Sequence, residues 1–530
     1  MNKGPKDTKA TPADASKTKQ PITAQFSANL KWLKDNLGAS SDIVVRSISD
    51  RASGMEGAII YVDHLVDQQT VNQMIVHPIL AEIGSDSNLS PLDWLELLKN
   101  KALSVGRIEE VQSLDVALAQ LLDGNTVILL QGCASALSAS SSGGEKRGVE
   151  EPSTQTVVRG PKESFTESID TNLSLIRRRI KSPLLRIEFL QIGKQTMTRV
   201  AVLHMKGIAK ESILEEALTR LERIDTDSIL DSGYIEEYIQ DATFTPFPTM
   251  LSTERPDAVV GSLLEGQFAV VVDGSPFALI APVTFGQFFQ SSEDYYQRYD
   301  VATFLRIIRN IAFFVSLLFP SLFIAITTFH QEMLPPPLLI SLTAQREGVP
   351  FPAIIEALLM EITFEVLREA GVRMPRAIGP AISIVGALVL GQAAVQAGIV
   401  SAALVIVVSF TALANFVIPS INMSNAIRLL RFVMMLLAAM FGLFGILCGL
   451  MTLLIHLASL RSFGIAYLTP FSPFIWSNWK DILRAPRWTM RTRPISMSSG
   501  SNRTRQGRGQ GPQTPHRPGR GNDPNPGSNE

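Results

Sequence analysis

Cysteine and the common catalytic motifs are almost absent from this chain. Its 530 residues include only two cysteines, Cys133 and Cys448, which is too few for a disulfide framework or a zinc cluster. The sequence has no P-loop, no GxGxxG after a strand, no HExxH and no GxSxG, and its six histidines are scattered. We therefore predict that the protein is not an enzyme and has no catalytic residues, no metal and no cofactor.

Charge is missing from long stretches of the second half. From Asn310 to Leu460 there is no lysine and no aspartate. A helix needs roughly 20 apolar residues to cross a bilayer, and a soluble helix rarely runs so long without a polar face. Three runs carry no charged residue at all: 311–329, 377–427 and 432–460. The middle run is long enough for two crossings, so four spans are predicted, at about 306–329, 378–397, 399–419 and 432–458.

An apolar signal sequence is also missing, because residues 1–25 are polar and predict only a disordered extension. Arg306 and Arg309 precede the first span, and Arg461 follows the last. Because arginine collects on the cytoplasmic side of membrane proteins, we expect both flanks to be cytoplasmic and the number of crossings to be even. Residues 481–530, rich in Arg, Gly, Pro and Ser, are predicted to form a basic disordered tail.

The first half of the chain contains an internal repeat. "DVALAQLLDGNTVILLQGCASALSA" begins at Asp115, and "DAVVGSLLEGQFAVVVDGSPFALIA" begins 142 residues later, at Asp257. Each copy is typical of a capped helix that stops at glycine and is followed by two strands. This predicts an α/β N-terminal soluble region of two related lobes, followed by an all-α polytopic membrane domain. The expected boundaries are 26–140 and 157–300 for the lobes, 141–156 for a loop or linker, and 301–480 for the membrane domain.

A helix rich in glutamate interrupts the apolar half. In "EALLMEITFEVLREAGVRMPRAIGP", which begins at Glu356, Glu361, Glu365 and Glu369 are four residues apart and form one stripe. Carboxylates are costly in lipid, so the helix at 351–371 is predicted to be re-entrant or spanning, with its acids in one of three environments. They line a cation vestibule in a ring oligomer, pair between subunits with Arg368, Arg373 or Arg376, or lie on an exposed interfacial helix. Pairing of Glu365 with Arg368 in the same helix is the simple structural alternative.

The charge-free helix after it has two faces. One consists of small residues suited to close helix packing: Gly379, Ser383, Gly386, Ala393 and Ala397. The other would form an apolar constriction beneath a polar throat if it met its symmetry mates, and ordinary contact with lipid or a neighbouring helix is equally open. Its members are Val385, Val389, Gln392 and Gln396.

A basic cluster lies in the second repeat, formed by Arg177, Arg178, Arg179 and Lys181. Contact with anionic lipid headgroups and a solvated helix face are both consistent with it. Aromatic residues are not interleaved with these charges, so nucleic-acid binding is not expected.

Several long stretches resemble the A subunits of spore germinant receptors, the GerA family, from about residue 30 to about residue 495. The stretches are "EKRGVEEPSTQTVVRGPKESF", "LLRIEFLQIGKQTMTRVAVLHMKGIA", "STERPDAVVGSLLEGQFAVVVDGSP", "LISLTAQREGVPFP" and "REAGVRMPRAIGPAISIVGALVLGQAAVQAGIVS". The resemblance implies an integral protein of the spore inner membrane, with the large N-terminal region on the spore-core side. It also implies a transporter-like B subunit and a C-subunit lipoprotein as partners.

For the mechanism, the resemblance implies a ring-forming homo-oligomer that acts as a nutrient-gated cation channel. Two alternatives are a non-conducting scaffold that docks the other germination subunits and a signal-amplifying relative without its own nutrient partner. A solute carrier would show two inverted helix bundles with matching broken helices, and no such match is found. The sequence does not identify the nutrient.

Overall fold

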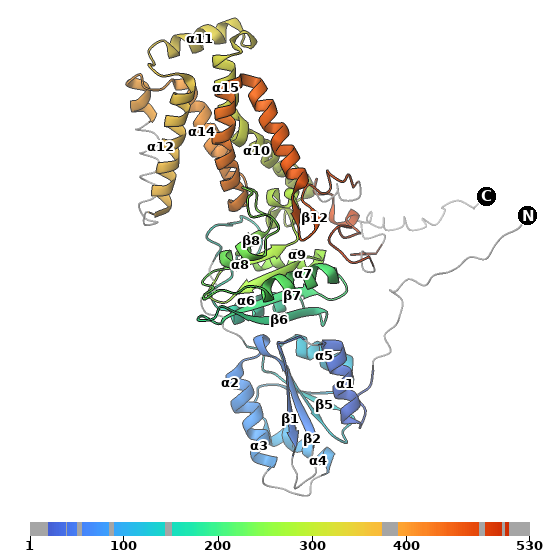
Figure 1. The fold of residues 1–530 in the computed structure, drawn as a ribbon. Helices are drawn as coiled ribbons and strands as arrows, with labels where there is room; N and C mark the ends of the chain where they lie inside the picture. Colours follow the sequence, from blue (N-terminus) through green and yellow to red (C-terminus); the bar gives the residue numbers. More distant parts are fainter. Residues whose placement is uncertain are drawn as a thin grey trace, which may run out of the picture.

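The computed structural model describes residues 20–38, 40–49, 56–83, 90–143, 151–373, 391–475, 483–500 and 504–507. Within these ranges the chain forms two α/β lobes stacked end to end and a helical bundle beyond the second lobe (Figure 1). The arrangement confirms the predicted fold class, an α/β region of two lobes followed by a helical region.

Lobe 1 is built around a five-stranded sheet of order β1-β2-β4-β5-β3, in which every pair is antiparallel. Its strands are β1 (Ile43–Ser49), β2 (Glu56–Val62), β3 (Ile108–Val111), β4 (Thr126–Leu130) and β5 (Ala136–Ala139). Its helices are α1 (Phe26–Leu37), α2 (Gln68–Thr70), α3 (His77–Ile83), α4 (Pro91–Leu97) and α5 (Leu114–Leu122), with short η1 (Asp63–Leu65), η2 (Val71–Val76) and η3 (Leu98–Ala102).

Lobe 2 repeats this plan with a sheet of order β6-β7-β9-β10-β8. Its strands are β6 (Leu185–Ile192), β7 (Thr198–Met205), β8 (Leu251–Thr253), β9 (Phe268–Val272) and β10 (Ala278–Ala281). Its helices are α6 (Ile169–Arg179), α7 (Glu211–Glu222), α8 (Ser232–Ile239) and α9 (Pro256–Glu265), followed by η4 (Phe285–Phe289) and η5 (Ser292–Tyr295).

The predicted repeat is confirmed in detail. The offset of 142 residues found in the sequence also relates the first residues of β1 and β6, β2 and β7, β4 and β9, and β5 and β10. The two lobes also share a side-chain lock: Asn29 donates to the Thr23 carbonyl at 2.6 Å, and Asn172 donates to the Thr166 carbonyl at 2.6 Å. The two lobes are therefore copies of one supersecondary plan.

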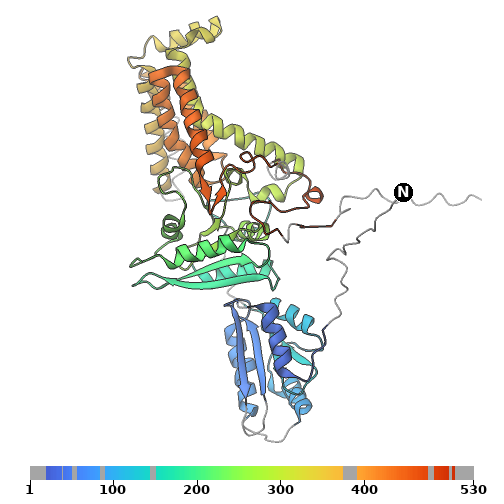
Figure 2. The same cartoon turned by 45° about the vertical axis from the view of Figure 1, so that its right-hand side comes forward.

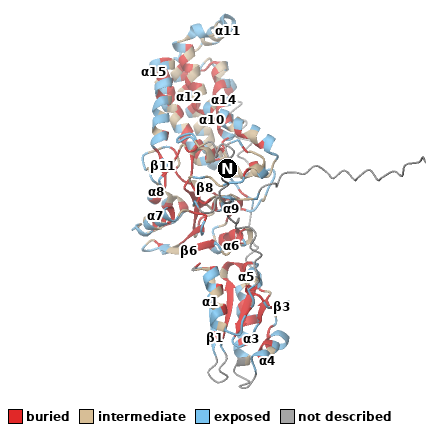
Figure 3. Ribbon diagram, turned by 90° about the vertical axis from the view of Figure 1, so that its right-hand side faces the viewer, coloured by how far each residue is buried: buried red, intermediate tan, exposed pale blue. Residues whose placement is uncertain are grey.

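Each sheet lies between two helical layers, because successive side chains of its central strands point to opposite faces and each face has its own apolar core. In β9, Phe268, Val270 and Val272 belong to one apolar cluster, while Ala269 and Val271 belong to another on the opposite face. This is the period-2 pattern of a strand buried on both sides. Figure 3 shows the buried strands at the centre of each lobe.

The helical bundle consists of α10 (Tyr299–Thr328), α11 (Pro336–Arg346), α12 (Ala353–Arg373), α14 (Ala402–Phe416) and α15 (Ile421–Ser459), with η6 (Gln331–Met333) after α10. Residues 391–396 are also helical. Two of the described helices, α10 and α15, are long and apolar enough to cross a membrane. The predicted span at 378–397 lies largely outside the described residues.

Helix α15 is a hairpin of two helical arms. Gly442 has φ 61° and ψ −140°, a conformation that only glycine adopts readily. Gly445 lies against the Leu437 carbonyl and Gly449 against Met434, although a straight helix would place residues 434 and 449 roughly 22 Å apart. The predicted span at 432–458 is therefore divided by a reversal, and Figure 2 shows the two arms side by side.

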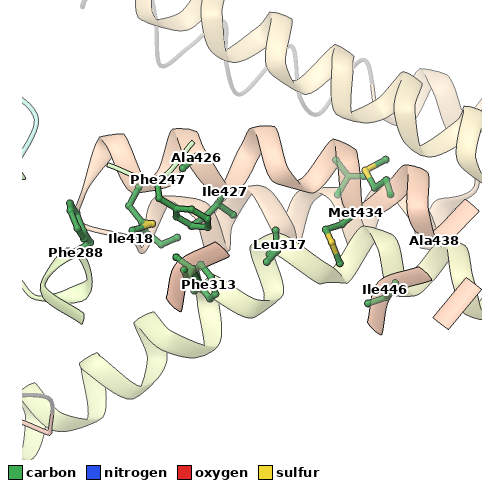
Figure 4. Close-up of a cluster of buried hydrophobic side chains, with 14 of the residues drawn as sticks. Phe247, Phe288, Phe313, Leu317, Ile418, Ala426, Ile427, Met434, Ala438 and Ile446 are labelled. Atoms are coloured by element: carbon green, nitrogen blue, oxygen red, sulfur yellow. The ribbon is translucent and has the colours of Figure 1, made fainter. Parts of the chain in front are cut away.

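Both ends of the bundle attach to lobe 2. One apolar cluster joins Phe247 and Phe288 of lobe 2 to Phe313 of α10 and Ile418 after α14 (Figure 4). After α15 the chain forms the two short strands β11 (Arg461–Ser462) and β12 (Ile465–Ala466), and the Phe285 amide donates to the Tyr467 carbonyl at 2.8 Å. The first and last helical segments therefore begin and end at the same lobe.

The C-terminal segment, residues 483–500 and 504–507, packs on lobe 2 and includes η8 (Arg487–Thr489). Met497 is buried in the same core as Phe463 and Ile465, and the Ser499 amide donates to the Ile208 carbonyl at 2.7 Å. The prediction of a disordered tail from residue 481 is wrong for these residues. The composition of the segment did not predict this order, because two buried methionines and backbone hydrogen bonds hold the segment in place, rather than a long apolar pattern.

Candidate functional site

Two glutamates of α12 face into the bundle. Glu356 and Glu361 are fully buried, whereas Ile362, Val366 and Val372 of the same helix are exposed. A helix with its acids inside and its aliphatic side chains outside cannot be stabilised by water on that outer face. The buried acids are therefore expected to have cationic or hydrogen-bonding partners within the bundle.

Arg431 of α15 is the main partner. Its Nη1 donates to Glu361 Oε2 at 2.8 Å, its Nε to the Ser316 carbonyl at 2.7 Å and its Nη2 to Ser316 Oγ at 2.8 Å. Pro320, inside α10, has no amide hydrogen and cannot bond to the carbonyl four residues earlier, which is that of Ser316. Arg431 therefore fills the gap left by the proline and joins three helices, α10, α12 and α15, at one point.

A second pair lies one turn further along α12. Arg428 Nε donates to Glu365 Oε1 at 2.8 Å, and Arg428 Nη1 donates to Asn425 Oδ1 at 3.0 Å. Arg368 Nη2 donates to the same Asn425 oxygen at 3.3 Å. The structure therefore pairs Glu365 with the neighbouring helix, and the alternative of pairing with Arg368 within α12 is not what is seen.

Glu356 binds the beginning of α14. The Ser401 amide donates to Glu356 Oε1 at 2.6 Å, and Ser401 in turn caps α14 by accepting from the Leu404 amide. Arg346 Nε of α11 lies 3.7 Å from Glu356 Oε2. A carboxylate at a helix N-terminus is favoured by the helix dipole, so Glu356 connects α11, α12 and α14.

A small cavity of about 20 Å³ lies among these paired glutamates and arginines. It has room for about one water molecule. Glu361 Oε1 is buried and has no hydrogen-bond partner among the described residues. The cavity is lined by Glu361, Phe364, Glu365, Arg368, Ala412, Asn415, Phe416, Arg428 and Arg431. Three guanidinium groups and two carboxylates thus surround a space that is too small for a hydrated cation.

The other predicted site residues have different environments. Glu369 is exposed and pairs with Arg373 of its own helix at 2.7 Å. Gln392 and Gln396, of the predicted pore face, are exposed, as are Ala393 and Ala397 of the predicted packing face. The remaining members of those two faces lie outside the described residues: Val385, Val389, Gly379, Ser383 and Gly386.

Arg428 and Arg431 were not predicted as partners of the glutamates, for which Arg368, Arg373 and Arg376 were expected. A usable signal was present, however. The chain has two arginines three residues apart and two glutamates four residues apart, each pair within apolar sequence. Either spacing puts both residues of a pair on one face of a helix, so the two faces can pair with each other.

A second buried charge group lies where α10 leaves lobe 2. Asp294 accepts from Arg306 Nε at 2.8 Å and from Arg309 Nη1 at 2.8 Å. Arg484 of the C-terminal segment donates to the Asp294 carbonyl at 3.1 Å and lies over the Tyr295 ring. The arginines expected to mark the membrane boundary thus fasten α10 and the C-terminal segment to lobe 2.

The predicted lipid-facing basic cluster lies at the junction of the two lobes. Arg177 is buried, and its Nε donates to Asp42 Oδ2 of lobe 1 at 2.7 Å. Arg178 donates to the Gly143 carbonyl at 3.1 Å, and Lys181 pairs with Asp123 at 2.7 Å. Arg179 pairs with Glu163. Arg177 in particular is enclosed by protein and is not available to lipid.

Two of the family-like stretches form one structural unit. Glu254 accepts from the Thr154 amide at 2.6 Å and the Gln155 amide at 2.8 Å, and Arg255 donates to the Pro161 carbonyl at 2.9 Å. Burial raises the pKa of Glu254, but the hydrogen bonds from the Thr154 hydroxyl and from the Thr154 and Gln155 amides outweigh burial and hold the pKa below its ordinary value. The segment that connects the lobes is thereby fixed to lobe 2.

No group of three or more His, Cys, Asp or Glu side chains suited to a metal ion is found within the described ranges.

Comparison with known proteins agrees with the resemblance noted in the sequence. Residues 31–496 match the family model described as Bacillus/Clostridium GerA spore germination protein. Spore germination protein KA of Bacillus subtilis (strain 168) is 48% identical over 93% of this chain and 90% of its own length. The uncharacterized membrane protein YfkQ of the same organism is 43% identical over 91% of this chain and 93% of its own length.

Among solved structures, the crystal structure of the N-terminal domain of the A subunit of the Bacillus megaterium spore germinant receptor GerK3 is similar. It is 37% identical, with a TM-score of 0.40, over 51% of this chain and 98% of that domain. The extent and identity of the sequence matches show that the chain belongs to the GerA family of spore germination proteins.

Proposed function

We propose that this chain is the A subunit of a nutrient-sensing germination receptor that assembles as a ring in the spore inner membrane and conducts cations when the nutrient is sensed. Its partners would be a transporter-like B subunit and a C-subunit lipoprotein. The function is non-enzymatic, and the two lobes lie on the spore-core side.

The exposed surface of the bundle supports a membrane location. Large apolar side chains are exposed along both α14 and α15: Ile406, Phe410, Leu413, Phe416, Leu429, Val433, Leu436, Met440, Leu447, Met451 and Ile455. A soluble protein rarely exposes so large an apolar surface. Lipid, or lipid together with further subunits, is the environment that fits it.

The observation that carries the assembly and the pore is the exposure of Gln392 and Gln396 within this apolar bundle. An amide that loses its hydrogen bonds in hydrocarbon costs several kcal/mol. Both side chains therefore favour a surface that meets water or another subunit. In a ring, copies of this surface would converge and enclose an aqueous path.

The buried charges would govern opening. In the described conformation Arg431 and Arg428 neutralise Glu361 and Glu365, so these carboxylates are not free to attract cations, while Glu369 is exposed. We expect the arginine pairs to hold α12 in the closed arrangement. A partner opens the ring only if it binds the open state more tightly.

Cation leakage from cells that express this chain tests the proposal. Val389→Ala is expected to raise leakage by widening the constriction, and Gln392→Leu with Gln396→Leu is expected to abolish it by removing the polar lining. The matched control is Leu447→Ala with Met451→Ala, two exposed positions on α15, which should leave leakage unchanged.

Absence of leakage from every variant, with the protein present and oligomeric in the membrane, would contradict conduction by this subunit. The scaffold and signal-amplifying alternatives would then be favoured. Loss of leakage in the control as well would show that the glutamine effect is not specific.

A further inference from the structure

In the first half of α10, Tyr299–Ile311, the two arginines face inward and several apolar side chains face outward, while Asp300 at the start of the helix is exposed. Arg306 is 2% exposed and binds Asp294. On the opposite side, Phe304 is 62%, Ile307 45% and Ile311 57% exposed. These three residues are three and four positions apart and share one helical face. Water does not favour such a face, so it is expected to have an apolar or interfacial contact.

The beginning of this helix carries an aromatic pair. Tyr299 lies edge-to-face against Trp488 of the C-terminal segment, with ring centroids 6.3 Å apart, and both side chains are partly exposed. Tyrosine and tryptophan combine an apolar ring with a polar tip and are enriched at membrane–water interfaces. The pair lies three turns before the charge-free run that begins at Ile311.

The surroundings of Trp488 are basic. The C-terminal segment from residue 483 to 507 contains several arginines and no acidic residue. Arg487 and Arg491, close to Trp488 in the chain, are exposed. This charge complements anionic lipid headgroups, which attract basic residues that lie near the membrane surface.

We propose that the outward face of Tyr299–Ile311, together with Trp488, binds the boundary between the headgroups and acyl chains of an anionic membrane on the lobe side. Figure 2 shows this part of α10 leaving the bundle obliquely, as an interfacial helix would. The proposal rests on the membrane location of the bundle given above. It places the start of lipid contact, at Tyr299, about two turns before the predicted span at 306–329, because Arg306 and Arg309 bind Asp294 rather than headgroups.

Spin labels on the full chain in phosphatidylglycerol-containing vesicles test this contact. Single cysteines replace Phe304 and Ile307 in a Cys448→Ser background, since Cys448 is the exposed native thiol and Cys133 is buried. Val158, 93% exposed on the lobe side, is the control for water, and Leu413, 64% exposed on α14, is the control for lipid. Collisions with oxygen report lipid, and collisions with a water-soluble nickel chelate report solvent.

We expect labels at 304 and 307 to lose most nickel collisions and gain oxygen collisions, as at 413 and opposite to 158. Nickel collisions at 304 equal to those at 158 would overturn the proposal. An immobile label shielded from both reagents would also overturn it, in favour of contact with protein. If the label at 413 also reports water, the membrane location of the bundle is wrong. If only the labels at 304 and 307 report water, the interfacial contact of α10 alone is wrong.

The anionic preference has its own comparison. In anionic vesicles, the double change Arg487→Gln with Arg491→Gln is expected to restore part of the nickel collisions of the label at 304. With both arginines present, neutral phosphatidylcholine vesicles should raise the nickel collisions at 304 in the same way. Equal protection at 304 in neutral and anionic vesicles would overturn the role of the arginines.

Discussion

Lobe 2 contacts the helical bundle on one side and lobe 1 on the other, and the two contacts differ in chemistry. Toward the bundle the contact is apolar and aromatic, and Phe288 and Phe313 belong to one cluster that continues into the bundle. Toward lobe 1 the contact is polar, with the buried Arg177–Asp42 pair and a hydrogen bond from Arg186 to the Leu37 carbonyl. Apolar burial tolerates small displacements because it is non-directional, whereas a buried ion pair is stable only in a narrow geometry.

This difference teaches which parts move together. Lobe 2 and the bundle share a core and are fastened again by Asp294 and the C-terminal segment, so we expect them to act as one unit. Lobe 1 is held by a few specific bonds. A rearrangement of the soluble region is therefore expected at the junction between the lobes, and four predictions test this comparison, from the largest effect to the smallest.

Phe288→Ala should destabilise the unit of lobe 2 and bundle most. The side chain is 1% exposed and lies 6.0 Å from the Tyr467 ring, and truncating a buried phenylalanine costs about 3–5 kcal/mol. Thermal unfolding of the full chain in detergent measures the loss. Phe244→Ala, at a fully exposed position, is the control, and equal effects of the two changes would contradict a shared core.

Arg177→Ala should separate the lobes without unfolding the bundle. The change leaves Asp42 buried without its cation, at a cost of about 3–5 kcal/mol, and should expose the connecting segment to limited proteolysis. Arg177→Met combined with Asp42→Leu removes both charges and should recover most of the protection. If the single and double variants are cleaved alike, the ion pair does not hold the junction.

Acid pH should destabilise lobe 2 beside the same junction, where His204 of β7 is opposite Arg186 of β6. Burial, and then the cation of Arg186, lower the pKa of His204 to about 4; Glu188 Oε1 lies 3.9 Å away, too far for a hydrogen bond. Because the unfolded state binds a proton near pH 6.5 and the folded state does not, stability is complete above that pH and is lost as pH falls toward 4. The loss is about 2 kcal/mol between pH 7 and 5.

Unfolding temperatures at pH 7, 6 and 5 measure this loss, and His204→Gln should flatten the profile. The same slope in the wild type and the variant would assign the pH dependence to other groups.

Lys181→Ala should change stability least, by less than about 1 kcal/mol. The Lys181–Asp123 pair also joins the two lobes, but its side chains are 59% and 49% exposed. Proteolytic protection of the connecting segment should remain as in the wild type. Cleavage comparable to that of Arg177→Ala would show that exposed charges, and not the buried pair, hold the junction.

Much of the fold was readable from local patterns. The repeat offset of 142 residues relates strand to strand in the structure, because each strand and helix is specified by nearby residues in the same order in both copies. The glutamate stripe was also readable from helical periodicity. Its partners were not, because a salt bridge between α12 and α15 depends on how helices distant in the chain pack.

Two misjudgements have related causes. The basic cluster was expected to contact lipid headgroups or solvent, but Arg177 is buried and binds Asp42, 135 residues away. The tail was expected to be disordered, but Met497 fills a place in the core of lobe 2. In both cases the composition describes the segment in isolation, whereas contacts with the neighbouring surface determine whether the segment is buried and ordered.

The sequence by itself determined the two-lobed plan, the apolar character of the second half, the acidic stripe and the family, because these follow from spacing and similarity along the chain. Only the tertiary structure decided that Arg431 binds the carbonyl freed by Pro320, that α15 reverses at Gly442 and that α10 hides its arginines. The two arginine arrangements depend on partners in other elements of the fold, where the cost of burying an unpaired charge or carbonyl selects the partner. The reversal depends on packing of the two arms of α15 against each other around one glycine.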